Sequence, residues 1–186
     1  MRTLFYAINY PKDTCPFSEC PTIKTHLDGF LTNQNIPDYY EIALGNMKDS
    51  VKEIFEECLN CRLENLFATN LIFRQTKNAD ELKQYWKEAN LCWQVHELAL
   101  QKIDPEVIVT CGNGKTRSAY SYILKKCDGK EIFSQNLYNS FKIKIAEITL
   151  NNQKKLLLGL PHLSRVSKDI LKTNLIELKN NGKLQI

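Results

Sequence analysis

The sequence predicts an α/β protein, a three-layer α/β/α arrangement around a central, mainly parallel sheet of four strands. Short runs of apolar and β-branched residues alternate along the chain with segments of helical periodicity, which is typical of this class. Each of the four apolar runs also stops at a polar or glycine-containing segment, as buried strands of such a sheet do. The 186 residues are enough for one domain with a sizeable core, so we expect a single domain over 1–186.

The strand candidates stand out as short apolar runs between turn residues. They are Thr3–Ile8, Leu66–Thr69, the run that starts at Val107, and Lys155–Leu160. Prolines separate several of these runs from their neighbours: Pro11 follows the first, Pro105 precedes the third and Pro161 ends the fourth. A further segment, 141–150, alternates enough to be a strand or one arm of a hairpin.

Helices are predicted where apolar residues recur at helical spacing. These segments are Met47–Leu59, Ala79–Ile103, Thr116–Lys126 and Ser167–Lys179, with a weaker one at Ile23–Asn33. Ser167 is a plausible N-cap for the last of them. The remainder of 12–46 is rich in proline and glycine, so we expect it to be irregular.

Bulk properties narrow the protein class. The net charge of +4 is compatible with a polyanionic partner, and no apolar run is long enough to span a membrane. The N-terminus does not resemble a signal peptide, so we expect a cytoplasmic protein. Seven cysteines, an odd number, favour free thiols in a reducing compartment. We expect no metal or other cofactor, although Cys15, Cys20, Cys58 and Cys61 leave a four-thiolate metal or iron–sulfur site as an alternative.

Polar residues gather where the predicted strands end. The four segments are Asn9-Tyr10-Pro11, Asn70, Gly112-Asn113-Gly114 and Pro161-His162-Leu163-Ser164. Because the carboxyl ends of parallel strands lie at one edge of a sheet, these segments should form one cleft. The glycine turn, followed at once by a helix, can hold an anion such as a phosphate. Another histidine, His96, falls inside the long predicted helix beside Trp93, where a structural role is the better interpretation.

From about Leu4 to Arg165 the chain resembles the uracil-DNA glycosylase superfamily. Four segments carry the resemblance, in the family's order: Ala7-Ile8-Asn9-Tyr10-Pro11, Thr69-Asn70-Leu71-Ile72-Phe73-Arg74, Val107–Gly114, and Gly159-Leu160-Pro161-His162-Leu163-Ser164-Arg165. The first is similar to the Gly-Ile-Asn-Pro-Gly motif of the mismatch-specific branch, and the last to the His-Pro-Ser motif of the minor-groove loop. Asn9 stands where the classical uracil branch has an Asp, and Leu163 stands where His-Pro-Ser has its Pro.

The resemblance implies a role for each of these residues. Asn9 would orient the attacking water, and His162 would donate a hydrogen bond to the base as the C1′–N bond breaks. Asn70 would pair with the Watson–Crick edge of a pyrimidine, for which its amide offers both a donor and an acceptor. The aromatic residue that stacks on the base is left open among Tyr10, Phe17 and Phe73.

Contacts to the DNA backbone are implied for the glycine turn and the last motif. The candidates are Gly112, Asn113, Gly114, Lys115, Ser118, Ser164 and Arg165. Leu163, with Arg165 beside it, would insert into the duplex next to the flipped base. Each assignment has a plainer alternative, in which the asparagines cap turns, His162 bonds to backbone and the glycine turn only links a strand to a helix.

The resulting hypothesis is a monofunctional DNA glycosylase, a monomer that hydrolyses the bond to uracil or another modified base in single- or double-stranded DNA. A DNA-binding or base-sensing module with weak or no activity is the alternative, because of the departures from the family motifs. A nucleotide- or nucleoside-processing enzyme that uses the same cleft is a third possibility.

Overall fold

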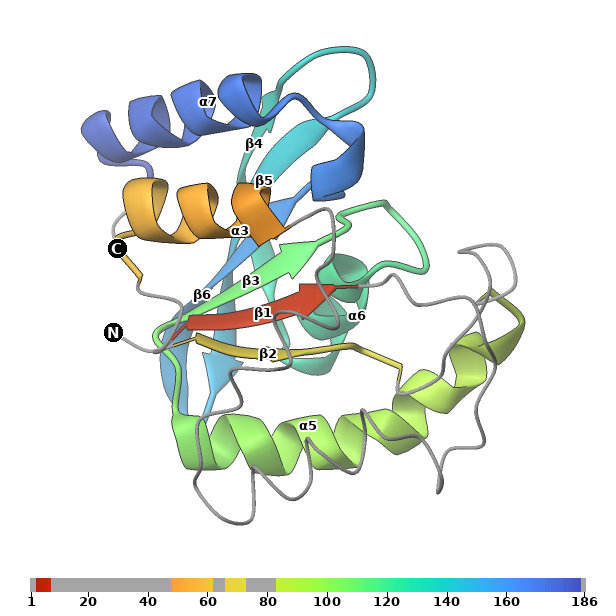
Figure 1. Ribbon diagram of the computed structural model, residues 1–186. Helices are drawn as coiled ribbons and strands as arrows, with labels where there is room; N and C mark the ends of the chain where they lie inside the picture. The colour runs from red at the N-terminus through yellow and green to blue at the C-terminus, as the bar shows by residue number, and fades with distance from the viewer. Residues whose placement is uncertain (1–2, 8–47, 62–65, 73–82, 185–186) are drawn as a thin grey trace.

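The computed structural model describes residues 3–7, 48–61, 66–72 and 83–184 (Figure 1). Its strands are β1 (Thr3–Ala7), β2 (Leu66–Thr69), β3 (Val107–Cys111), β4 (Lys130–Asn136), β5 (Lys142–Leu150) and β6 (Gln153–Leu160). Its α-helices are α3 (Lys48–Glu53), α5 (Ala89–Ile103), α6 (Ala119–Lys126) and α7 (Lys168–Asn180). A π-helical turn, Ile54–Cys58, extends α3, and 3₁₀ helices cover Lys83–Glu88 and Leu163–Arg165.

The strands form one six-stranded mixed sheet in the order β2-β1-β3-β6-β5-β4. Strands β2, β1, β3 and β6 are parallel to one another, and they correspond to the four strands expected from the sequence. Strands β5 and β4 continue the sheet in antiparallel pairing. The expectation of a four-stranded, mainly parallel sheet is therefore wrong in strand number and in the share of parallel pairing.

Local backbone geometry explains the antiparallel part. Asn151 and Asn152, between β5 and β6, have φ angles of 51° and 60°. Two consecutive positive φ values are typical of the tight hairpin turn that reverses the chain between paired strands. Strand β4 lies at the edge of the sheet with mostly exposed residues, so its sequence carries no apolar run that could reveal it.

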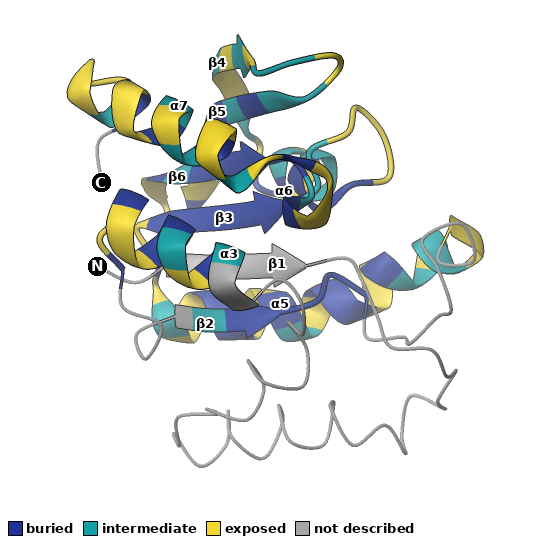
Figure 2. Cartoon of the chain, turned by 45° about the horizontal axis from the view of Figure 1, so that its top comes forward, coloured by how far each residue is buried: buried dark blue, intermediate teal, exposed yellow. Residues whose placement is uncertain are grey.

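Helices cover both faces of the sheet, with α3 and α7 on one face and α5 and α6 on the other (Figures 1 and 2). Alternate residues of the central strands pack against the helix layers on the two faces of the sheet. Val109 and Leu158 pack with α3 and α7, whereas Ile108 and Leu157 pack with α5 and α6. Because both faces are covered, all five residues of β3 are buried, which is why the strand reads as a continuous apolar run.

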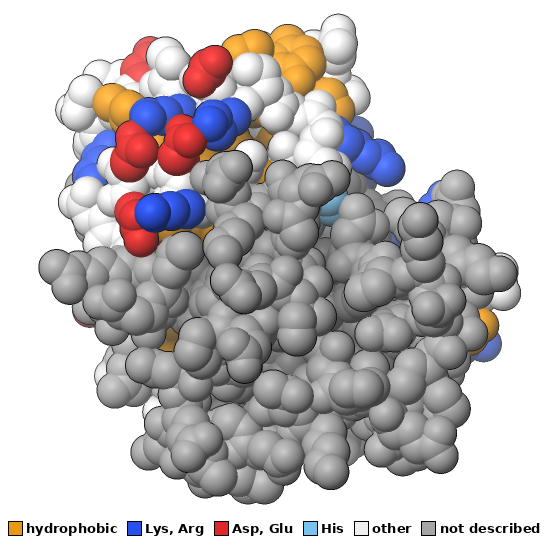
Figure 3. Space-filling view, viewed as in Figure 1, with side chains coloured by type: hydrophobic (Ala, Val, Ile, Leu, Met, Phe, Trp, Pro, Cys, Tyr) orange, Lys and Arg blue, Asp and Glu red, His pale blue; other side chains and the backbone are white. Residues whose placement is uncertain are grey.

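Helix α7 is attached to α3 by packing and by charge. Leu171, Leu175 and Leu178, at helical spacing, are buried against the layer that contains Phe55. On the rim, Lys168 Nζ lies 2.6 Å from Glu53 Oε1, and Lys172 contacts Glu57. Basic and acidic side chains alternate on this part of the surface (Figure 3). Ser167 occupies the N-cap position of α7 as predicted, but its side chain makes no capping hydrogen bond.

None of the helices in the described part of the chain combines the length and the apolarity needed to cross a membrane.

Candidate functional site

The carboxyl ends of the four parallel strands meet at one edge of the sheet. Their last residues are nearly in register, since Tyr6 pairs with Thr69, Ala7 with Cys111 and Cys111 with Leu160. The segments after β3 and β6 therefore start side by side, and the segment after β2 starts at the same edge with β1 between it and β3. Convergence of these strand ends was the central expectation from the sequence, and the pairing bears it out for the described residues.

His162, which follows β6, is half-buried and has a defined tautomer. Its Nδ1 accepts a hydrogen bond from the backbone N–H of Ser164 at 3.4 Å and lies 2.8 Å from Ser164 Oγ. A backbone N–H can only donate, so Nδ1 carries the lone pair and the ring proton is on Nε2. Burial and, secondly, the charge of Arg165 lower the pKa of His162. Both effects favour the neutral imidazole, with its proton on Nε2.

The loop that carries His162 is anchored on both sides. Arg165 N–H donates to His162 O at 2.9 Å, closing the 3₁₀ turn. Tyr138, in the β4–β5 connection, donates from its hydroxyl to Arg165 O at 3.3 Å and accepts from Ser167 N–H at 3.3 Å. Leu163, expected to insert into the duplex, is only 4% exposed and belongs to the core. An intercalating side chain must project from the surface, so the buried Leu163 cannot insert into DNA in this conformation and instead anchors the loop to the core.

The glycine turn after β3 is held by specific hydrogen bonds. Gly112 has a φ of 117°, which disfavours any residue with a side chain, and its N–H donates to Leu160 O at 2.8 Å. Asn113 Nδ2 donates to Lys142 O at 2.6 Å and to Gly159 O at 2.8 Å. The Asn113 amino group thus fastens the turn to β5 and β6, which removes that group from the predicted phosphate contacts.

Ser118, another predicted phosphate ligand, is buried and caps α6. Its Oγ accepts from Ser121 N–H at 3.1 Å and donates to Gly114 O at 2.7 Å. Ser118 and Ser121 form a reciprocal capping box. Gly114 and Lys115 are exposed on the turn, and Ser164 and Arg165 are exposed beside His162. These four positions are accessible to a ligand, whereas Asn113 and Ser118 support the loop.

Asn70, at the end of β2, is 7% exposed and therefore nearly buried. The residue after it is tied to α5, because His96 Nε2 lies 3.1 Å from Leu71 O. A carbonyl can only accept, so Nε2 donates in this contact. His96 is itself 1% exposed, and its ring centroid lies 6.3 Å from that of Trp93. The structural role expected for His96 is confirmed: it fixes the segment that presents Asn70.

Several predicted positions lie outside the described residues, namely Asn9, Tyr10, Phe17 and Phe73, together with Cys15 and Cys20. The other two cysteines of the alternative metal site, Cys58 and Cys61, are buried. Burial raises the pKa of the Cys58 thiol and so keeps it protonated. Across the ranges that the structure covers, no group of three or more His, Cys, Asp or Glu is placed to hold a metal ion.

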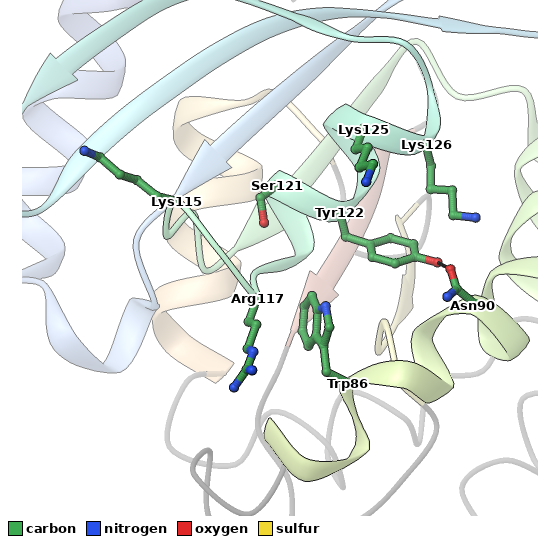
Figure 4. Close-up of a pocket in the computed structure, with 8 residues that line it drawn as sticks. All are labelled: Trp86, Asn90, Lys115, Arg117, Ser121, Tyr122, Lys125 and Lys126. Carbon is green, nitrogen blue, oxygen red and sulfur yellow. Dashed lines mark hydrogen bonds between the residues drawn. The ribbon is translucent and has the colours of Figure 1, made fainter.

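A basic groove next to the glycine turn was not identified from the sequence. It has a volume of about 520 Å³ and runs between the 3₁₀ helix 83–88, the start of α5 and helix α6 (Figure 4). Its lining is Trp86, Asn90, Lys115, Arg117, Ser121, Tyr122, Lys125 and Lys126. The available sequence signal was the occurrence of Lys115 and Arg117 just before one short helix and of Lys125 and Lys126 in its last turn. The contribution of Trp86 needs the tertiary structure.

Comparison with protein-family models and with curated proteins found no match for this chain.

Proposed function

We propose that the protein is a monofunctional DNA glycosylase, of the uracil-DNA glycosylase type, that removes uracil or another modified base from DNA. The observation that carries the proposal is the tautomer of His162 at the shared edge of the parallel strands. Ser164 occupies Nδ1, so the imidazole presents an N–H donor without a positive charge. This group is suited to a leaving base that becomes negatively charged as its bond to the sugar breaks.

The chemistry is heterolysis of the C1′–N bond, with water as the nucleophile. The bonding electron pair moves onto the base, the sugar takes oxocarbenium character, and water adds at C1′ with loss of a proton. A hydrogen bond aimed at the developing charge contributes about 10²- to 10³-fold in rate. Burial lowers the pKa of His162, which favours the neutral ring, and the neutral ring with its proton on Nε2 can donate without carrying a positive charge.

Other residues would bind and orient the substrate. Asn70, nearly buried at the end of β2, would read the edge of a base that has been flipped out of the helix. Gly114, Lys115, Ser164 and Arg165 are exposed on the two neighbouring loops and would contact phosphates. Asn9, which lies outside the described residues, would hold the water through its amide oxygen, as the family resemblance implies.

The decisive experiment is a panel of modified-base oligonucleotides, single- and double-stranded, scored for alkali-sensitive abasic sites. The panel includes uracil, its mismatches, deaminated purines and phage-type modified bases. We expect strand breaks for at least one substrate, and a rate about 10²- to 10³-fold lower for His162→Ala. Lys183→Gln, an exposed substitution that follows the end of α7, is the control. A complete lack of abasic sites across the panel would refute the proposal.

A base-sensing module without chemistry is the second candidate. Residues 70–72, 112–118 and 161–167 contain asparagine, histidine, serine and basic residues and no Asp or Glu, so these three segments supply no carboxylate base. Tight binding to modified DNA without base release, unchanged in Asn9→Ala, would favour this candidate. Single-turnover base release that is slowed in both Asn9→Ala and His162→Ala would exclude it.

A further inference from the structure

The basic groove defined above lies beside the candidate site and shares only Lys115 with the residues of the proposed function. Residues 112–114 end β3 at the strand edge, and Lys115 and Arg117 follow directly and line the groove. Arg117 has a φ of 50°, a left-handed conformation that is costly for a residue with a long side chain. The groove therefore begins where the glycine turn ends.

The groove has the charge of an anion-binding surface. Lys115, Arg117, Lys125 and Lys126 supply four exposed cations, and none of the eight lining residues is acidic. The cations come from both ends of α6: two precede the helix and two form its last turn. This spacing suits a chain of successive phosphates better than a single anion, because it distributes the positive charge along the length of a helix.

Aromatic rings form the floor of the same groove. The Trp86 and Tyr122 rings meet edge to face, with centroids 6.1 Å apart, and Trp93 packs behind Tyr122 at 5.7 Å. Tyr122 donates from its hydroxyl to Asn90 Oδ1 at 2.8 Å, and burial raises the pKa of Tyr122 to about 12. Lys126 Nζ lies 5.7 Å from the Tyr122 ring centroid. Figure 4 shows the half-buried Trp86 indole between Arg117 and Tyr122.

We propose that this groove binds single-stranded DNA next to the target nucleotide, with phosphates on the four cations and one base stacked on Trp86. Cations combined with aromatic rings are how proteins hold single strands without reading their sequence, since every base has a face that can stack. The inference rests on the proposed function for the choice of DNA as the ligand. The binding itself stands on the lining of the groove.

Salt dependence of binding measures the phosphate contacts. The probe is a thymidine oligonucleotide of about 12 nucleotides that contains no modified base. Its binding to the protein is measured by fluorescence anisotropy. For single strands, each phosphate contact adds about −0.7 to the slope of log binding constant against log salt concentration. Four contacts therefore predict an affinity loss of about 50-fold between 50 and 200 mM salt. Lys125→Gln/Lys126→Gln removes two contacts, so the loss should shrink to about 7-fold.

The matched control is Lys52→Gln/Lys183→Gln. It lowers the net charge from +4 to +2, as the groove variant does, but at exposed positions on the α3 and α7 face. The control should keep the wild-type slope. Equal slopes for the groove variant and the wild type would overturn the inference, and so would tighter binding of RNA of the same length than of DNA.

Trp86 provides a readout specific to stacking. The chain has two tryptophans, and the other, Trp93, is 7% exposed, so quenching by bound DNA should come from Trp86. Trp86→Phe should abolish the quenching while keeping a ring for stacking, and Trp86→Ala should weaken binding about fivefold or more. Undiminished quenching in Trp86→Phe would overturn the stacking contact, and the lysine variants test the groove even if Trp86→Ala fails to fold.

The two proposals fail separately. Base release from a modified trinucleotide, whose two internucleotide phosphates cannot occupy all four cations of the groove, reports mainly on the candidate site. If the trinucleotide is cleaved but the oligonucleotide does not bind, the groove inference is lost and the glycosylase stands. If no modified base is released from any substrate while the oligonucleotide binds with the expected slope, the glycosylase is lost and the groove stands.

Discussion

Gly159→Ala is a sharp test of how the fold supports the candidate site. Gly159 lies in β6, where it pairs with Thr110 of β3 and Lys144 of β5. A Cβ atom at this position would lie 2.5 Å from Tyr120 Cδ2 and 2.9 Å from Cε2. Ordinary carbon–carbon contacts are about 3.5 to 4.0 Å, so the Tyr120 ring would have to move by about 1 Å.

The Tyr120 ring has little freedom to move. It is 1% exposed, its hydroxyl donates to Glu131 Oε2 at 3.1 Å, and Lys144 Nζ lies 5.2 Å from its centroid. Overpacking a well-filled core costs about 1 to 3 kcal/mol, and the restraints on this ring place Gly159→Ala near the upper end. For a chain of this length each kcal/mol lowers Tm by about 2 to 4 °C, so we expect a decrease of about 4 to 12 °C.

Circular dichroism during thermal and urea unfolding measures this loss. The control is Gly114→Ala, because the nearest atom to a Cβ there is Thr116 O at an ordinary 3.6 Å. In a Tyr120→Leu background the cost of Gly159→Ala should fall by half or more, since the clashing ring is gone. If Gly159→Ala melts within about 1 °C of Gly114→Ala, close packing of β6 on α6 does not constrain this site.

Three further predictions concern the loops of the candidate site. Asn113→Ala leaves Lys142 O and Gly159 O without a donor and should lower the free energy of unfolding by about 1 to 2 kcal/mol in urea titrations; an unchanged midpoint would contradict this. Tyr138→Phe loses both hydroxyl contacts to the His162 loop, so amide exchange of residues 163–167 should accelerate while the helices stay protected. His162 has a lowered pKa in the folded state, so the unfolded state binds the proton more readily, and stability should fall as pH drops below about 6.5. In His162→Asn this part of the pH dependence should disappear, and an identical pH profile for both proteins would argue against the neutral imidazole.

Features set by local interactions could be predicted from the sequence. The run at Val107 indicates a buried strand because both of its faces meet helices. The spacing of Ile170, Leu171, Leu175 and Leu178 indicates helix α7, in which the three leucines are buried and Ile170 is exposed. The convergence of the strand ends followed from the alternation of strands and helices, since parallel strands present the same ends at one edge. His96 was also assigned correctly, as a helical histidine beside a tryptophan.

Other features depend on partners that are distant in the sequence. Strand β4 is exposed and pairs with β5 at the edge of the sheet, so its own residues carry no apolar signal. The sequence alone marks Asn113 and Leu163 as polar and apolar loop residues, and only the tertiary structure directs one to the carbonyls of β5 and β6 and the other to the core. The basic groove likewise needs Trp86 to meet α6 across the fold.

The chain's own pattern of residues thus determined the four parallel strands and the helices that cover them, and which polar residues lie at the ends of those strands. Tertiary packing decided which of those polar groups form hydrogen bonds within the protein and which remain exposed to a ligand. The reason is physical: backbone periodicity acts over a few neighbouring residues, whereas hydrogen-bond satisfaction and burial are decided by contacts between elements that meet only in the folded chain. His162 depends on both the sequence pattern and the folded structure. The end of β6 sets its position in the chain, and the turn at Ser164 sets its tautomer.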